Sequence, residues 1–560
     1  MANCLQVGRV TPCAPQFVFA RTAGRGLPAL PIRVHPCPSV VKMALPELIE
    51  IVPLDNPVRA EITVPGSKSI TNRALILAAL ADGEVTLEGA LWSEDTQIMV
   101  ECLQDLGFMV NVAPDPDEIC NRTITVYGRG GTIPGGGTVE NPLELFVGNA
   151  GTAARFLAAL VCLGKGVYRL HGVPRMHERP QAALFQALRE LGYRVESENG
   201  IDKLPVRIFG HESFSDHKRI IEPFIPKYQD MLTGEKSRSC KVSIEKSSQF
   251  ASALLLCAKI GNWKIEVIGE NAEESPYVAM TSKLIEAFPK RGGEFQIEPD
   301  ASSGSYFWAV EKLTPISVEP LEPGAPLERA PGTSSETITG FGKPGSPMKW
   351  ERILSSRIEV VNWPRSGWQI DEHFREFMTF GPKMHELLGA EKRAKGADEK
   401  EIQRLVLEIR KSSKRDLSRL HDLGDSIMTA IVICPILEEK IRFTDLGRLR
   451  VQETERVVAL RTELTKCGAK VIEEGDTLTV YPSQLHGAEI ETYNDHRMAM
   501  CFAVLGLKVP GIKIRNPACV KKTFPNFFQK LAAPPPNGLG ATILDAKTGR
   551  KLKEEELFAE

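Results

Sequence analysis

The stretch Pro65-Gly66-Ser67-Lys68-Ser69-Ile70-Thr71-Asn72-Arg73 joins a short extended run, residues 61–64, to an apolar run, residues 74–80, that predicts a buried helix. Hydroxyls, a lysine and an arginine therefore stand at a helix N-terminus, where free N–H groups and the helix dipole attract anions. The stretch lacks the full spacing of a nucleotide-binding P-loop. Two interpretations stay open at this point: an anion site, or an ordinary Ser/Thr cap beside a solvated lysine.

Bulk composition describes an ordinary globular protein. The 560 residues are enough for two or more domains, and 42% apolar and 25% charged residues are typical values. A net charge of −2 gives no overall attraction to nucleic acid or to a membrane, and the longest apolar runs are too short to span one. The 12 cysteines are scattered without Cys-x-x-Cys pairs, which favours reduced thiols over a zinc site. We expect no metal and no cofactor.

The two ends of the chain differ from the rest in amino-acid composition. Residues 1–42 carry basic residues and many prolines but no acidic residue, which is compatible with a plastid transit peptide. Translation that properly starts at Met43 is an equal alternative. We expect residues 1–43 to be a disordered extension. The stretch 533–560 is rich in proline and glycine and then charged, so we expect a disordered tail there too.

A pattern of buried helix, strand, amphipathic helix and strand recurs along the chain. The expected buried helices begin at residues 68–73, 148–155, 247–249, 300–303, 424–426 and 494–497. Several amphipathic helices end at a glycine, at Gly107, Gly192 and Gly468. Helices that are apolar nearly all round are interior helices. The pattern therefore predicts an α/β fold in which strands and amphipathic helices wrap the buried helices.

Cationic side chains collect at the predicted helix starts, among the serines, threonines and aspartates that cap helices routinely. Capping does not require the arginines and the lysine found beside them. If these helix ends converge, they form a site for one or more multiply charged anions, with arginine as a bidentate partner.

These motifs resemble those of the EPSP synthase (3-phosphoshikimate 1-carboxyvinyltransferase) family. The similarity lies, in the family's order, at residues 65–73, 149–155, 174–180, 247–249, 300–306, 425–429, 450–456, 493–500 and 522–525. The resemblance implies the two-domain enolpyruvyl transferase fold, an inside-out α/β barrel of six repeats with buried helices. It assigns residues 44–66 and 300–532, with an insertion at about 311–420, to one α/β domain and residues 67–299 to the other.

The resemblance also implies a reaction: the enolpyruvyl group of phosphoenolpyruvate moves to the 5-hydroxyl of shikimate-3-phosphate, and phosphate leaves. Asp425, Glu453, Lys68 and Lys522 would be catalytic. Asp425 would take the hydroxyl proton and Glu453 would serve the methylene carbon. The alternatives from the residues alone are that Asp425 is a helix cap and Glu453 a helix-end charge.

The substrate-binding residues implied by the resemblance come from both predicted domains. They are Lys68, Ser69, Arg73, Asn149, Gly151, Thr152, Arg179, Ser247, Ser248, Gln249, Ser275, Gln452, Arg456, His496, Arg497 and Lys522. Of these, Lys68, Arg179, Arg456, Arg497 and Lys522 would hold phosphoenolpyruvate. His496 would either assist proton transfer or cap a helix. The family is the target of glyphosate, and Gly151 would leave room for that inhibitor.

Several features depart from the family's pattern. Gln452 stands where a lysine is usual, Arg448 stands near a usual asparagine, and the serine at 275 is displaced. Residues 211–239 and 311–420 are extra, and we expect them to be solvated surface elaborations. The alternatives to this function are enolpyruvyl transfer to UDP-N-acetylglucosamine and a non-catalytic anion-binding relative. We expect a monomer in the cytoplasm, or in a plastid if residues 1–42 are a transit peptide.

Overall fold

The computed structural model describes residues 45–211, 238–269, 275–315, 317–321, 336–341, 349–379, 415–437 and 439–559. Residues 1–42 are a separate unit from residues 43–560, and the predicted N-terminal extension lies outside the described residues. Most of the predicted insertion at 211–239 lies outside them as well. Within the described chain, no helix combines the length and the apolar character that crossing a membrane requires.

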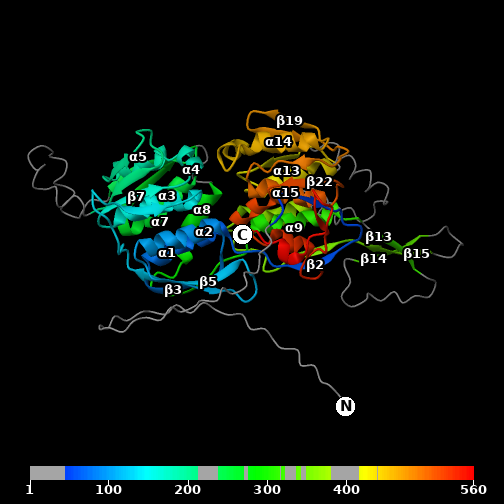
Figure 1. Cartoon of the computed structure of the whole chain (residues 1–560), viewed down its shortest axis with the longest axis horizontal. Coiled ribbons are helices and arrows are strands. Elements are labelled where there is room, and N and C mark those ends of the chain that lie inside the picture. Colours follow the sequence, from blue (N-terminus) through cyan, green and yellow to red (C-terminus); the bar gives the residue numbers. More distant parts are fainter. Residues whose placement is uncertain are drawn as a thin grey trace, which may run out of the picture. The chain divides into compact units, whose positions relative to one another are not determined.

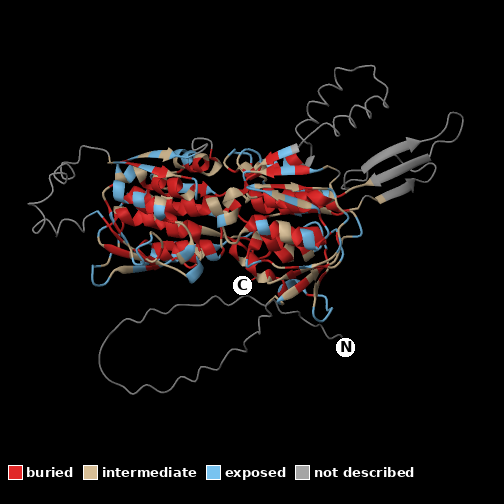
Figure 2. Ribbon diagram, turned by 90° about the horizontal axis from the view of Figure 1, so that it is seen from above, coloured by how far each residue is buried: buried red, intermediate tan, exposed pale blue. Residues whose placement is uncertain are grey.

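Six helices of the described chain are buried on nearly all sides, as the repeat predicted. Helices α1 (Lys68–Leu80), α3 (Gly151–Leu160) and α7 (Gln249–Gly261) pack against one another inside one hydrophobic cluster. Helices α9 (Ala301–Leu313), α13 (Ile427–Ile433) and α15 (His496–Gly506) pack together inside a second. Figure 1 labels the two groups of helices, and Figure 2 shows that the interior of the described chain is buried. Every residue of α3 and α13 is buried, so neither helix has a solvent face.

Four sheets repeat one arrangement, in which one parallel pair is followed by two antiparallel pairs. Their strand orders are β12-β3-β5-β4, β6-β7-β9-β8, β17-β18-β20-β19 and β21-β22-β1-β23. The strands are β1 (Leu48–Ile51), β3 (Asp82–Leu91), β4 (Val110–Pro114), β5 (Asn121–Arg129), β6 (Leu143–Phe146), β7 (Val167–His171), β8 (Arg194–Ser197), β9 (Val206–Phe209), β12 (Gly293–Gln296), β17 (Arg415–Ser418), β18 (Ile441–Thr444), β19 (Val471–Glu474), β20 (Thr477–Val480), β21 (Glu489–Ile490), β22 (Ile512–Arg515) and β23 (Ile543–Asp545). The common order is independent evidence that the chain is built from repeats.

The amphipathic helices of the repeats bury one face each. They are α2 (Glu94–Asp105), α5 (Ala182–Glu190), α8 (Pro276–Ala287) and α14 (Arg456–Lys466). Gly107, Gly192 and Gly468 follow three of them with φ of +86°, +89° and +90°. Only glycine adopts this left-handed conformation without strain, so these residues end the helices as predicted.

Smaller elements complete the described chain. Strands β10 (Arg238–Ser243) and β11 (Trp263–Ile268) form a parallel pair, and β13 (Ser317–Leu321), β15 (Lys349–Leu354) and β14 (Glu336–Phe341) form an antiparallel sheet. The short helices are α4 (Pro174–Glu178), α10 (Phe374–Thr379) and α16 (Phe527–Ala532). The two hydrophobic clusters take their residues from 70–297 and from 49–64 with 306–559. The predicted domain boundaries themselves stay a prediction.

The expectation of a disordered C-terminal tail is wrong. Strand β23 pairs antiparallel with β1, and Leu539, Ile543 and Leu557 are buried in the second cluster. In its sheet β23 occupies the outer place that β4, β8 and β19 take in theirs. The tail is therefore the last strand of a repeat, and its apolar residues were hidden among prolines, glycines and charges.

The expectation that residues 311–420 are only a surface elaboration is also wrong for part of the segment. Strand β16 (Arg357–Val360) pairs in parallel with β2 (Arg59–Ile62), and both Ile358 and Val360 are buried. Residues 380–414 of the segment lie outside the described residues. The described part supplies a strand of the fold, because β2 has no other partner among the described strands.

Candidate active site

One pocket brings together most of the residues singled out in the sequence. Predicted site residues that line it are Lys68, Ser69, Arg73, Gly151, Thr152, Arg179, Ser247, Ser248, Gln249, Asp425, Gln452, Glu453, Arg456, His496 and Arg497. Helices α1, α3, α7 and α15 begin with or beside these residues, so their N-termini meet at the pocket. Free N–H groups and helix dipoles thus add to the charge of the side chains in attracting anions.

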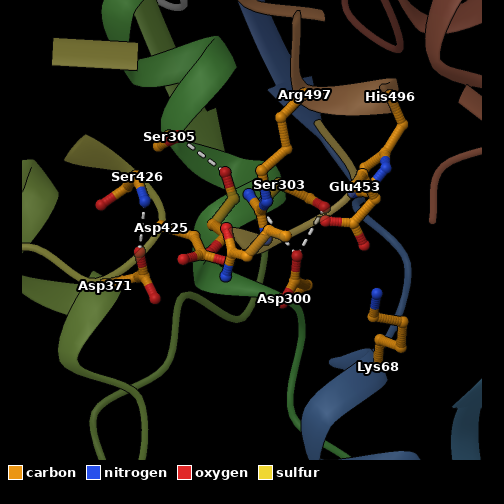
Figure 3. Close-up of polar contacts among 12 residues, drawn as sticks. Lys68, Asp300, Ser303, Ser305, Asp371, Asp425, Ser426, Glu453, His496 and Arg497 are labelled. Atoms are coloured by element: carbon orange, nitrogen blue, oxygen red, sulfur yellow. Dashed lines mark hydrogen bonds and ion pairs between the residues drawn. The ribbon is translucent and has the colours of Figure 1, made fainter. Parts of the chain in front are cut away.

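Glu453 is surrounded by cations. Its carboxylate lies 3.1 Å from Lys522 Nζ and 3.0 Å from Arg456 Nη2. Burial would raise the pKa of Glu453, but the charges of Lys522, Arg456 and Arg179 hold it well below its usual range. The same contact keeps the pKa of Lys522 above its ordinary value although burial opposes this. Lys522 is therefore joined to the site by its ion pair with Glu453, which is labelled in Figure 3.

Asp425 is held by two guanidinium groups. Arg419 Nη2 lies 2.7 Å from one carboxylate oxygen, and Arg497 Nη2 lies 3.3 Å from the other. Burial would raise the pKa of Asp425, but Arg497 and Arg419 hold it far below its usual range. Asp425 is consequently a carboxylate at neutral pH, and it precedes Ser426, the N-cap residue of α13, rather than capping that helix itself.

Gly151 brings the start of α3 close to two arginines. An added Cβ at Gly151 would lie 2.6 Å from Arg155 Nη1 and 2.8 Å from Arg179 Cζ. Arg155 Nη1 donates to Gln249 Oε1 at 2.8 Å, and burial followed by the charge of Arg179 lowers the pKa of Arg155 well below its ordinary value. Two guanidinium groups this close repel each other, and an anion between them would relieve that repulsion.

His496 and Lys68 face the same side of the pocket (Figure 3). Both ring nitrogens of His496 are buried without a hydrogen-bond partner among the described residues. Burial, and then the charge of Lys68, lowers the pKa of His496 well below its usual value, so the ring is neutral. Lys68 Nζ lies 3.3 Å from Asp95 Oδ2. A buried imidazole without partners that faces a pocket indicates a bound polar ligand.

Hydroxyls and two further arginines also line the pocket. Arg73 is buried, and it donates hydrogen bonds to Thr281 Oγ1 at 2.7 Å and to the carbonyl of Ser69 at 2.8 Å. Arg448 donates to Ser248 Oγ at 2.7 Å and to the carbonyl of Ile244 at 2.5 Å. Burial lowers the pKa of Arg448 to about 10, so it remains a cation at neutral pH.

The pocket also differs from the prediction. Asn149 and Ser275 do not line it: the Asn149 carbonyl accepts from Arg179 at 3.3 Å, and Ser275 is buried at the start of α8. Residues that line it but were not predicted as ligands include Asp95, Arg155, Gln369, Asp371 and Arg419, and Arg448, which stands near a usual asparagine, lines it too. Arg155 lies inside the motif 149–155, and Arg448 lies just before the motif 450–456, so the sequence could have predicted both as site residues. Gln369 and Asp371 lie in the segment expected to be peripheral.

Comparison with known proteins decides the family. The family model described as EPSP synthase (3-phosphoshikimate 1-carboxyvinyltransferase) matches residues 53–323 and 358–531. The 3-phosphoshikimate 1-carboxyvinyltransferase of Trichormus variabilis is 34% identical over 504 residues, which cover 86% of this chain and 98% of that protein. The chain belongs to the EPSP synthase family.

Two further EPSP synthase relatives extend the comparison. The chloroplastic 3-phosphoshikimate 1-carboxyvinyltransferase of Solanum lycopersicum is 32% identical over 520 residues, covering 88% of this chain and 85% of that protein. The solved structure of EPSP synthase from Acinetobacter baumannii has a TM-score of 0.52 at 18% identity and covers 89% of this chain and 99% of that one. With the buried-helix repeats, this similarity confirms the predicted two-domain enolpyruvyl transferase fold.

Proposed function

We propose that the chain transfers the enolpyruvyl group of phosphoenolpyruvate to the 5-hydroxyl of shikimate-3-phosphate and releases inorganic phosphate. The observation that carries this proposal is the convergence of the family's motif residues, from stretches far apart in the sequence, on one cation-lined pocket. Membership of the EPSP synthase family supports it. The proposed substrates carry two phosphates and two carboxylates, which suits a pocket built from lysines, arginines and helix N-termini.

The reaction needs two proton transfers and charge neutralisation. The hydroxyl oxygen bonds to C2 of phosphoenolpyruvate while its proton leaves, and C3 gains a proton, which gives a tetrahedral adduct. The C2–O bond to phosphate then breaks, and C3 loses a proton to restore the double bond. We assign Asp425 to the hydroxyl and Glu453 to C3, with Lys68, Arg179, Arg456, Arg497 and Lys522 around the phosphate and carboxylate.

Glu453 can act at C3 because its cations are shared with the substrate. In the free pocket Lys522 and Arg456 hold it as a carboxylate. A bound phosphate and carboxylate would draw those cations and add negative charge, so the affinity of Glu453 for a proton rises. In the loaded site Glu453 is then protonated and can donate to C3.

A phosphate-release assay tests the function. Purified protein should release phosphate from phosphoenolpyruvate only when shikimate-3-phosphate is present. Turnover with UDP-N-acetylglucosamine instead would place the chain's activity with the sister reaction, and no turnover with either acceptor would favour an anion-binding role. A monomeric state and a cytoplasmic or plastid location stay predictions.

The two carboxylates are tested by isosteric replacement. Asp425→Asn and Glu453→Gln should each lower kcat by roughly 10²–10⁴-fold, the usual range for acid–base groups, with smaller changes in KM. Asp416→Asn is a matched control, because Asp416 also pairs with an arginine, Arg442, at 3.2 Å but is exposed and does not line the pocket. A Glu453→Gln or Asp425→Asn variant with near-normal kcat would remove that residue from its role.

A further inference from the structure

Asp371 is a further carboxylate of the pocket, placed against the two residues that flank Asp425. It lies in a short 3-10 helix, η3 (Ile370–His373), is buried, and lines the pocket. Its Oδ1 accepts the backbone N–H of Ser426 at 2.6 Å, as Figure 3 shows. Its Oδ2 lies 2.5 Å from the position of an added Cβ at Gly424. The Asp371 carboxyl group thus touches the residues on both sides of Asp425.

The segment that carries Asp371 is fixed to the start of α9. Gln369 Oε1 accepts the backbone N–H of Ala301 at 3.0 Å, and Gln369 Nε2 donates to the carbonyl of Pro299 at 2.9 Å. Gln369 is itself buried and lines the pocket. A side chain held by such contacts keeps its position, which is what a group that reacts with a bound substrate requires.

The two carboxylates differ in what neutralises them. Both oxygens of Asp425 meet guanidinium groups, at 2.7 Å and 3.3 Å. Asp371 accepts a backbone N–H and, within the described part of the chain, forms no ion pair. The charged or titratable groups that face it are Asp425, Arg497, Arg419 and Tyr277. Burial, and then the charge of Asp425, raises the pKa of Asp371, whereas that of Asp425 is lowered.

This difference separates two tasks at the acceptor hydroxyl. A carboxylate that its neighbours strongly stabilise as an anion keeps a proton only briefly at neutral pH, because its proton affinity is low. It remains a good hydrogen-bond acceptor that can orient a hydroxyl. A neighbouring carboxylate whose oxygens form no ion pair has a higher proton affinity. Pairs of carboxyl groups whose surroundings push their proton affinities apart divide acid–base roles in this way.

We propose that Asp371 is the group on which the proton of the acceptor hydroxyl comes to rest, after Asp425 has taken that proton from the hydroxyl that it and its arginines orient. The inference rests on the proposed function. The hydroxyl O–H bond breaks as its oxygen bonds to C2, and the proton moves to the Asp425 carboxylate and from there to the Asp371 carboxylate. The proton on Asp371 later leaves with the phosphate or to water, so no oxidant or other reactant is needed.

The test compares pH profiles of kcat in the full-length chain. Asp371→Asn keeps the size of the side chain and an acceptor for Ser426 N–H but cannot take up a proton. It should lower kcat by roughly 10²–10⁴-fold with less change in the KM for shikimate-3-phosphate. In the wild type, kcat should fall as pH drops through the raised pKa of Asp371; this acid limb should be lost or move to lower pH in the variant.

Two further variants separate chemistry from folding. Asp371→Glu retains a carboxylate and should recover part of the rate that the Asn variant loses. Asp422→Asn is the control, because Asp422 likewise accepts a backbone N–H, from Ser418 at 2.7 Å, but is exposed and outside the pocket. The control should retain the wild-type profile.

Each outcome decides the proposal. If Asp371→Asn keeps the wild-type kcat and acid limb, Asp371 is not the proton acceptor. If the Asn and Glu variants both lose cooperative unfolding or lose kcat equally, the role of Asp371 is structural and the proposal is overturned. A wild type without turnover on shikimate-3-phosphate would overturn the proposed function instead, which keeps the two failures distinguishable.

Discussion

At the scale of single residues, Gly151 is the position where one methyl group changes the site most directly. Its added Cβ would lie 2.6–2.8 Å from the guanidinium groups of Arg155 and Arg179, so at least one of them must move. Gly151→Ala should raise the KM for phosphoenolpyruvate several-fold and weaken competitive inhibition by glyphosate by more. Steady-state kinetics with both ligands measure this. Equal inhibition of the two proteins would contradict the steric argument.

Glu453 gives a prediction about protons that is independent of turnover. Its pKa is lowered in the free site, so it is ionised at pH 6–7, and cations withdrawn by phosphoenolpyruvate should raise that pKa. Binding should therefore be accompanied by proton uptake, which calorimetry in buffers of different ionisation enthalpy detects. The ligand's own phosphate also exchanges protons, so the comparison is with Glu453→Gln. Identical proton uptake in the two proteins would show that Glu453 does not change its protonation on binding.

The sequence predicted a site residue well where a motif marks a helix start. Lys68 and Arg497 line the pocket because the N-termini of buried helices meet there, and each helix start is a local signal. Asp371 carries no such signal. It reaches the pocket through a strand pair, β16 with β2, whose partners lie about 300 residues apart, and no local pattern encodes that pairing.

At the scale of elements, the C-terminal tail is the clearest case of structure set by tertiary partners. Strand β23 has only three residues, and its pairing with β1 is what makes it a strand. Short apolar runs between prolines and glycines do not reveal such a partner, so composition alone predicts disorder. The repeated sheet order explains the result, because without β23 the edge of β1 would be unpaired.

Removing the tail should therefore destabilise the protein. A chain that ends at Ala533 loses β23 and the buried side chains Leu539, Ile543 and Leu557. Each buried leucine or isoleucine contributes about 1.5–3 kcal/mol, so the loss is comparable with a typical margin of stability once the strand's hydrogen bonds are added. Thermal unfolding and solubility measure the effect. A truncated chain with an unchanged Tm would show that the tail is dispensable.

A substitution in the same segment provides the control. Ile543→Ala removes buried apolar volume and should lower stability by about 2–5 kcal/mol, whereas Lys547→Ala removes an exposed side chain whose contact is a surface ion pair to Glu47. The surface change should cost no more than about 1 kcal/mol. This contrast separates packing of the tail from a general effect of altering the C-terminus.

At the scale of the whole molecule, the pocket draws its residues from the elements around both hydrophobic clusters, and hydrogen bonds connect these elements across it. Arg448, in η5 (Leu446–Val451), donates to Ser248 at the start of α7 and to the carbonyl of Ile244, which follows β10. Gln452, next to that short helix, instead accepts a hydrogen bond from Arg456. The cation at position 448 thus lies beside Ser248, a residue expected to bind substrate. Position 452, where the family usually has a lysine, holds a neutral amide.

Arg448 should consequently supply the charge that Gln452 lacks. A charged donor contributes about 1.5–3 kcal/mol and a neutral one about 0.5–1.5 kcal/mol, so Arg448→Asn should weaken acceptor binding by about 1 kcal/mol, roughly fivefold in the KM for shikimate-3-phosphate. Adding Gln452→Lys places a cation at the usual position and should bring this KM back toward the wild-type value. Arg442→Asn removes an exposed arginine paired with Asp416 and should leave the KM for shikimate-3-phosphate unchanged. The double-mutant cycle measures the coupling between positions 448 and 452. Strictly additive effects would mean that Arg448 joins the two clusters but does not replace the lysine.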